Sequence, residues 1–150
     1  MLIYEGGRLF AGRSSFALPS KCKINDAPLA TLRNGINLCS LDETCLIDAN
    51  FEYGEGGAQT SLESSLAIND ILDAKIKSRS FKGGIGWCAE YRGISYSYWE
   101  VRFDAPTGVI DKGDKEANIF RIAVTAPIDA NMPSIQHLPE IMELLNSFHP

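Results

Sequence analysis

The chain has 150 residues, of which 45% are hydrophobic and 22% charged, and its formal net charge is −5 at pH 7. This length and composition predict one domain over residues 1–150 with a substantial core, and they exclude a fibrous or disordered protein. Because an acidic chain repels phosphate backbones, we expect no nucleic-acid partner. The densest basic stretch, Lys75 to Lys82, is interpreted as the solvated end of a helix or strand.

No stretch approaches the ~20 apolar residues that a membrane-spanning helix needs. The first residues, MLIYEGGRLFAG, lack the charged start and the apolar run of a secretory signal peptide. We therefore expect no membrane insertion and a cytoplasmic location.

Short strands are predicted for the first third of the chain. Residues 8–19 suggest one strand that ends at Pro19, with a bend at Gly12. Residues 36–41 and 45–53 suggest the two arms of a hairpin. Along the second arm polar and apolar residues alternate, which predicts one buried face and one wetter face.

A helix is predicted within residues 54–76. Thr60 and Glu63 have the spacing of a capping box at its start. Asn69 and Asp70 favour an early end, which leaves its length open. The apolar face would comprise Leu62, Leu66, Leu72 and Ile76.

The second half predicts three strands followed by a helix. Residues 84–91 and 94–104 form a second hairpin, residues 105–118 a polar connection and residues 119–127 a further strand. Residues 133–150 form the last helix, with Pro139 in its first turn. Its apolar stripe would comprise Leu138, Ile141, Met142, Leu145 and Phe148. Strands grouped in runs predict an α+β fold: a mostly antiparallel sheet of six or seven strands flanked by two main helices.

Two glycine-rich stretches raise the question of nucleotide or anion binding. Gly84, Gly86 and Ala89 match a dinucleotide fingerprint, but no helix of useful length can follow them. We therefore interpret these glycines as part of a strand, where they mark a bulge or a close backbone approach. Residues 53–60 do connect a strand to a helix, whose first N–H groups could hold an anion. Glu55 would repel phosphate there, which favours a plain connection.

The cysteines and histidines do not predict a catalytic or metal site. No C-x-x-C pair is present, so no metal or other cofactor is expected, and the four thiols are interpreted as reduced. Cys22 lies between Lys21 and Lys23, whose charge would favour a reactive thiolate. His137, at the entrance to the last helix, is interpreted as a surface or capping residue. We therefore predict that the protein is not an enzyme, with a Cys22 nucleophile as the alternative.

One strand carries a candidate contact surface. In residues 94–104, Trp99, Val101 and Phe103 point to the predicted core, and the alternate residues point to the other face. On that face lie Tyr96, Tyr98 and Arg102, residue types enriched at binding hot spots, and we predict that they bind a partner. The alternative is that a helix or loop covers them.

Several phrases of the sequence resemble the PsbP/DcrB-like superfamily: SSFALP, INLCSL before CLIDANFEY, TSLESSLAIND, YSYWEVRF and IMELLNSF. The resemblance covers most of the chain and implies an antiparallel sheet between helices, an α/β/α sandwich. Members of that family are accessory proteins rather than enzymes, and no site residue is carried over from them. The bacterial members carry a lipoprotein signal, which this chain lacks.

The sequence therefore predicts a non-enzymatic protein-binding or assembly module of unidentified partner and oligomeric state. The alternative function is a small-ligand-binding protein with a pocket between the sheet and a helix.

Overall fold

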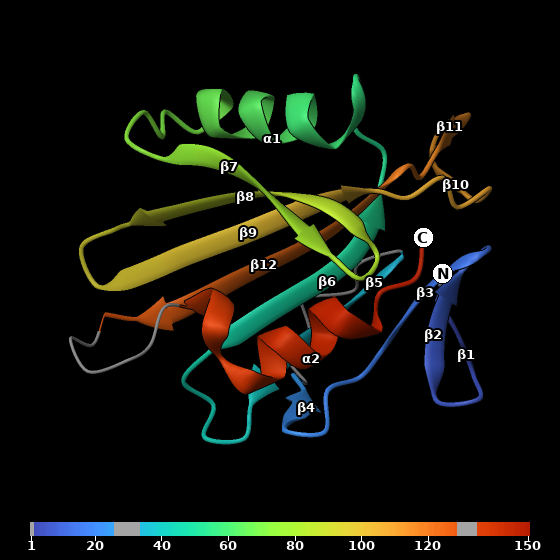
Figure 1. The fold of residues 1–150 in the computed structure, drawn as a ribbon, viewed down its shortest axis with the longest axis horizontal. Coiled ribbons are helices and arrows are strands. Elements are labelled where there is room, and N and C mark those ends of the chain that lie inside the picture. Colours follow the sequence, from blue (N-terminus) through green and yellow to red (C-terminus); the bar gives the residue numbers. More distant parts are fainter. Residues whose placement is uncertain (1, 26–33, 129–134) are drawn as a thin grey trace.

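The computed structural model describes residues 2–25, 34–128 and 135–150. Its centre is an antiparallel sheet of seven strands, flanked by α1 (Gly57–Ile68) on one face and α2 (Pro139–Ser147) on the other (Figure 1). This confirms the predicted α+β fold. In spatial order the strands are β4 (Cys22–Ile24), β5 (Gly35–Ser40), β6 (Leu46–Glu52), β12 (Ile119–Pro127), β9 (Tyr96–Asp104), β8 (Gly84–Arg92) and β7 (Lys75–Phe81).

A smaller three-stranded sheet lies beside the main sheet, where the sequence predicted a single strand. It comprises β1 (Ile3–Glu5), β2 (Arg8–Ala11) and β3 (Ser14–Ala17). The expected bend at Gly12 is a full reversal, because this glycine has a left-handed φ of 58°. The predicted polar connection also carries a short hairpin, formed by β10 (Ile110–Lys112) and β11 (Lys115–Glu116).

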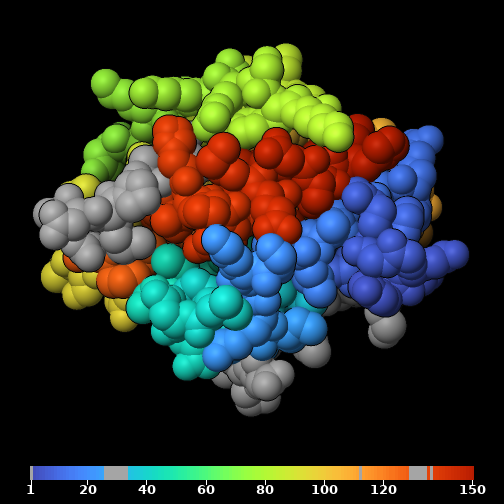
Figure 2. Space-filling view, turned by 60° about the horizontal axis from the view of Figure 1, so that its bottom comes forward, coloured from blue at the N-terminus to red at the C-terminus, as the bar shows by residue number. Residues whose placement is uncertain are grey.

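The main core lies between the sheet and α2. The ring of Phe120 lies at its centre, with the ring centroids of Phe148, Phe51 and Phe16 at 4.5, 4.7 and 5.1 Å. The predicted core residues Trp99, Val101 and Phe103 belong to the same cluster. Rings at these separations pack favourably, and they lie among the aliphatic side chains of the same core cluster. Figure 2 views this face, where α2 lies between the region of β7 and the N-terminal segments.

The helix α2 follows a short 3-10 turn, η1 (Ile135–His137), and Pro139 is its first residue, which confirms the predicted place of this proline. The predicted helix was longer, residues 133–150, and its first two residues lie outside the described ranges. The buried stripe of α2 differs from the prediction by one position. Leu144 is buried, whereas Met142 is 42% exposed.

The helix α1 packs Leu62 and Leu66 against Ala89 of β8, with Trp87 and Tyr91 beside them. Its end at Ile68 confirms the early stop predicted from Asn69 and Asp70, and Asp70 takes a left-handed φ of 56°.

The last two residues predicted for the apolar face of this helix, Leu72 and Ile76, lie outside the helix. Leu72 is exposed beyond the end of α1, and Ile76 lies in β7. The early end of the helix at Ile68 accounts for both differences.

The start of α1 differs from the predicted capping box. The N-cap is Gly56, so Thr60 lies inside the helix. The cap comes from a distant strand instead: the backbone N–H of Ala58 donates to Oδ1 of Asp104, with 2.8 Å between nitrogen and oxygen. A carboxylate at this end of a helix satisfies a free N–H group and interacts favourably with the helix dipole.

Candidate functional site

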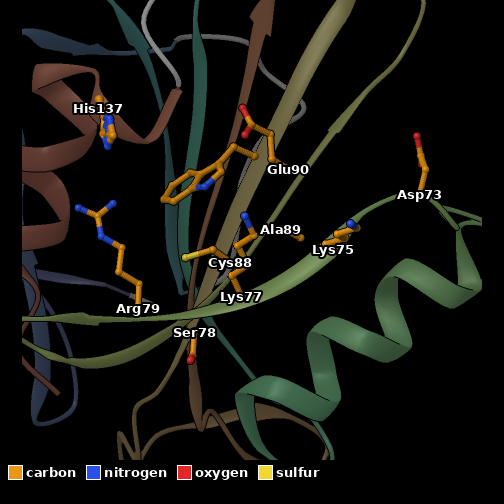
Figure 3. A pocket seen from close by; sticks show the side chains of 10 residues that line it. Asp73, Lys75, Lys77, Ser78, Arg79, Cys88, Ala89, Glu90 and His137 are labelled. Atoms are coloured by element: carbon orange, nitrogen blue, oxygen red, sulfur yellow. The ribbon is translucent and has the colours of Figure 1, made fainter.

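A recess of about 550 Å³ lies on the α2 side of the sheet, between the edge strand β7 and η1 (Figure 3). Cys88 of β8 and Trp99 of β9 form its floor. Its polar lining includes Lys75, Lys77, Arg79 and His137. Figure 3 shows Arg79 and His137 extending into the space from the two sides. The recess is thus a cavity with an apolar floor and cations along one wall.

The alternation of β7 places its cations on this wall. Lys77 is the register partner of Cys88, and Arg79 is the partner of Gly86. Because side chains two residues apart in a strand share a face, Lys75, Lys77 and Arg79 all point to the α2 side. From the sequence alone, these cations are interpreted as the solvated end of a helix or strand. Their period of two was the pattern that could have identified a common face.

The recess carries a net positive charge in an acidic protein. Its lining contains Asp73 and Glu90 as well as the three cations of β7. Within the part of the chain that the structure describes, neither Lys75 nor Lys77 forms an ion pair. Solvent-facing ammonium groups without an anionic partner attract anions at short range.

The Cys88 thiol on the floor is not set up as a nucleophile. Burial raises its pKa to about 11, and the nearby charge of Arg79 lowers it by less. At pH 7 the group is therefore a neutral thiol, whereas cysteine catalysis needs the thiolate. The recess is suited to holding a ligand rather than to attacking one through this residue.

The reactive thiolate considered as an alternative at Cys22 finds no support in the structure. Burial, and then the charge of Glu140, raise the pKa of Cys22 to about 11. Lys23, which was expected to favour the thiolate, pairs instead with Glu43 at 2.8 Å. All four cysteines are free thiols, as predicted.

The three residues predicted to bind a partner do not form one surface. Tyr96 is 48% exposed, and Tyr98 is half-buried and stacked on Tyr91 with ring centroids 5.2 Å apart. Arg102 is only 6% exposed, so its place on the predicted contact surface is wrong. The helix α1 covers it, and its guanidinium donates to the Ser61 hydroxyl of that helix.

Arg102 belongs to a buried chain of charges on the α1 side. It lies 3.4 Å from Glu52 and 3.4 Å from Glu100. The same oxygen of Glu100 accepts from Nε of Arg121 at 2.7 Å. Glu100 and Arg102 of β9 are thus covered by α1. The alternative prediction, that a helix or loop covers this face of the strand, is correct for these residues.

Large apolar side chains are exposed at one end of the sheet. Ile94, at the turn between β8 and β9, is fully exposed. Ile128 lies beside it, because its N–H donates to the carbonyl of Ser95, and Tyr96 is close in sequence. The connection from α1 to β7 lies at the same end of the sheet (Figure 1), and it contains the exposed Leu72. These four residues, Leu72, Ile94, Tyr96 and Ile128, are called the apolar end below.

Both glycine-rich stretches have structural explanations. Gly84 and Gly86 lie in β8, and a Cβ on Gly86 would come within 2.7 Å of a Val101 methyl carbon. Of the two predicted explanations, a bulge or a close approach to the backbone, the second therefore holds for Gly86, and side chains make the approach. A Cβ on Gly84 would meet nothing within 4 Å. At residues 53–60 the N–H group of Ala58, the second residue of α1, already donates to Asp104, so a carboxylate of the chain itself fills the place of the considered anion.

Among the described residues, no group of three or more histidine, cysteine, aspartate or glutamate side chains is placed to hold a metal ion. The helices of the described ranges also include none that is both long enough and apolar enough to cross a membrane.

Comparison with known proteins identifies no relative on which a function could be based. A scan against protein-family models finds no match, and a search of curated proteins finds none either. The resemblance to the PsbP/DcrB-like superfamily thus stays a prediction, and function has to be argued from the geometry of the recess.

Proposed function

We propose that this protein binds a small anionic ligand with an apolar part, in the recess between β7 and η1, and does not transform it. The observation that carries the proposal is the pairing of three cations on one wall with an apolar floor in one cavity of about 550 Å³. Cavities of this size suit metabolite-sized ligands, which are held by apolar walls and oriented by a few polar groups.

Each side chain has a distinct part in this proposal. The guanidinium of Arg79 supplies a planar pair of donors for a carboxylate or phosphate, while Lys75 and Lys77 act as point charges. Cys88 and Trp99 exclude water from the apolar part of the ligand. Because the lysines are exposed, their attraction is screened by salt, and affinity is expected to fall as ionic strength rises.

A fluorescent anion provides the test. Anilinonaphthalene sulfonate combines a sulfonate with fused rings, and we expect it to bind the folded protein saturably at the recess. The double variant Lys77→Glu/Arg79→Glu should weaken binding by about tenfold, which is ~1.4 kcal/mol.

The matched control is Lys21→Glu/Lys115→Glu, which makes the same change in net charge outside the recess. It should leave the affinity unchanged. Equal loss in both variants, or no saturable binding to a protein whose circular dichroism is native, would contradict the proposal.

A second candidate function is the protein-binding or accessory module predicted from the sequence. It is supported by the apolar end, where Ile94 is fully exposed beside Tyr96 and Ile128. Contiguous exposed apolar residues are typical of protein contacts. Accessory proteins of the PsbP/DcrB-like superfamily, which the sequence resembles, would have this kind of role, and the cytoplasm is the compartment proposed for it.

Site-specific crosslinking tests this second candidate. A photo-crosslinking amino acid at position 94 should capture one partner in a fixed ratio to the protein in cells. The control position is Ile110, another exposed isoleucine, at which no such adduct is expected. The same set of adducts from both positions, or none from position 94, would argue against a partner at the apolar end.

A further inference from the structure

A second recess, of about 370 Å³, lies where the hairpin of β2 and β3, called the N-terminal hairpin below, meets the end of α2 and the turn after β7. It shares no lining residue with the first recess. Figure 2 shows the N-terminal segments, α2 and the β7 region next to one another on this face. Its lining includes Arg8, Arg13, Lys82, Ser15 and Asn146, and no aspartate or glutamate.

Arg8 is held in place by neutral acceptors. Its Nε donates to the Ser15 hydroxyl at 3.0 Å, and its Nη2 donates to the backbone carbonyl of Ser147. These bonds fix the guanidinium plane without neutralising its charge, since neither acceptor carries a formal charge. A guanidinium has five N–H donors, so several of them remain for a ligand.

Arg13 is held in a similar way. Its Nε donates to the backbone carbonyl of Pro106, which leaves the two terminal nitrogens of its guanidinium. Lys82 brings a third positive charge from the turn between β7 and β8. In the described ranges, none of the three cations takes part in an ion pair.

From this arrangement we infer that the second recess binds a tetrahedral oxyanion, either free phosphate or the phosphate of a small phosphomonoester. Three positive charges around one recess repel one another. An anion placed among them is attracted to all three, and this attraction offsets the repulsion. Guanidinium groups bind phosphate oxygens in pairs, and two arginines already oriented by backbone carbonyls lose little freedom when they do so. The Ser15 hydroxyl can donate a further hydrogen bond.

The inference does not depend on the proposed function, because the two recesses have separate cations. The two recesses also suit different ligands. The first recess has Cys88 and Trp99 on its floor and suits a ligand with an apolar part. The second brings three cations and no carboxylate around one space, which Phe10 and Phe148 also line, and suits a compact charged group.

Titration with sodium phosphate at constant ionic strength, followed by amide chemical shifts, tests the inference. We expect saturable shifts around Arg13, Ser15 and Lys82, with a dissociation constant on the order of 1 mM. The variant Arg13→Gln/Lys82→Gln should weaken binding at least fivefold. Arg8 is left intact, because its bond to Ser147 ties the N-terminal hairpin to α2.

The variant Lys21→Gln/Lys115→Gln removes the same charge outside both recesses and is the matched control. Its phosphate affinity should equal that of the unmodified protein. No saturable shifts up to ~100 mM phosphate, or equal weakening in both variants, would overturn the inference.

Phenyl phosphate distinguishes the two sources of the anion. If it binds more tightly than inorganic phosphate at the same residues, the ligand is a phosphomonoester. If the two bind equally, it is the free ion, and both results support an oxyanion site.

Discussion

The two faces of the central sheet are built from the same strands but are held by different interactions. On β9 and β12, Phe103 lies opposite Phe120 toward α2, and one residue further along Arg102 lies opposite Arg121 toward α1. The first pair is part of a continuous cluster of rings. The second pair places two positive charges side by side, and Glu100 offsets their repulsion by accepting from both. The comparison teaches that alternation fixes the face on which each residue lies, while the helix above that face decides whether the residue is buried and needs a partner.

The largest expected effect is on the apolar face. Phe120→Ala removes the ring at the centre of the cluster and should lower the free energy of unfolding by about 4 kcal/mol. Urea denaturation followed by tryptophan fluorescence measures it. The control is Tyr96→Ala, at the exposed end, which should cost less than ~0.5 kcal/mol. A loss below ~2 kcal/mol for Phe120→Ala would mean that the rings are not the main support of this face.

On the face of the sheet that α1 covers, Glu100→Gln should cost about 3 kcal/mol, because it leaves the buried Arg102 beside the half-buried Arg121 without the carboxylate between them. The second variant Arg102→Met, added to Glu100→Gln, should restore part of this loss by removing one of the two charges. Denaturation of the single and double variants gives the coupling energy directly. If the two losses simply add, Glu100 does not offset the repulsion between the arginines.

A smaller effect is expected from Asp48, also on the α1 side. Burial raises its pKa above the ordinary value of 3.8, while Arg121 lowers it by less. The folded state therefore disfavours the charged carboxylate, and this destabilisation is present at neutral pH and disappears as the pH falls below 3.8. Asp48→Asn should thus stabilise the protein at pH 7 by a few tenths of a kcal/mol. Thermal unfolding of both proteins at pH 7 and at pH 3 checks this: the difference should vanish at the lower pH.

Local patterns were sufficient to predict the hairpins and the strand-rich α+β organisation. The hairpins of β5–β6 and β8–β9 follow from period-two alternation and turn residues, which act over a few positions. The close approach at Gly86 was also predictable, since a glycine inside a strand often has that cause.

Features that depend on distant contacts were not predicted. The cap of α1 is the carboxylate of Asp104, which accepts from the N–H group of Ala58, 46 residues away in the sequence. The sequence pattern offered only a local capping box. Arg102 was placed at the surface because a polar residue on the wetter side of a strand is usually exposed, and only the position of α1 makes it buried. The first recess brings β7 together with His137, residues far apart in the chain, which no local pattern reveals.

The strand β7 is an edge strand of the main sheet, and its positive charges disfavour edge-to-edge association of two copies of the protein. An unpaired edge strand can template further strands, and lysine side chains along it are a common means of preventing this. Two copies that met through β7 would bring Lys75, Lys77 and Arg79 of each against those of the other. A ligand that neutralises these cations would remove that protection, so occupancy of the first recess and resistance to polymerisation are linked through the same three side chains.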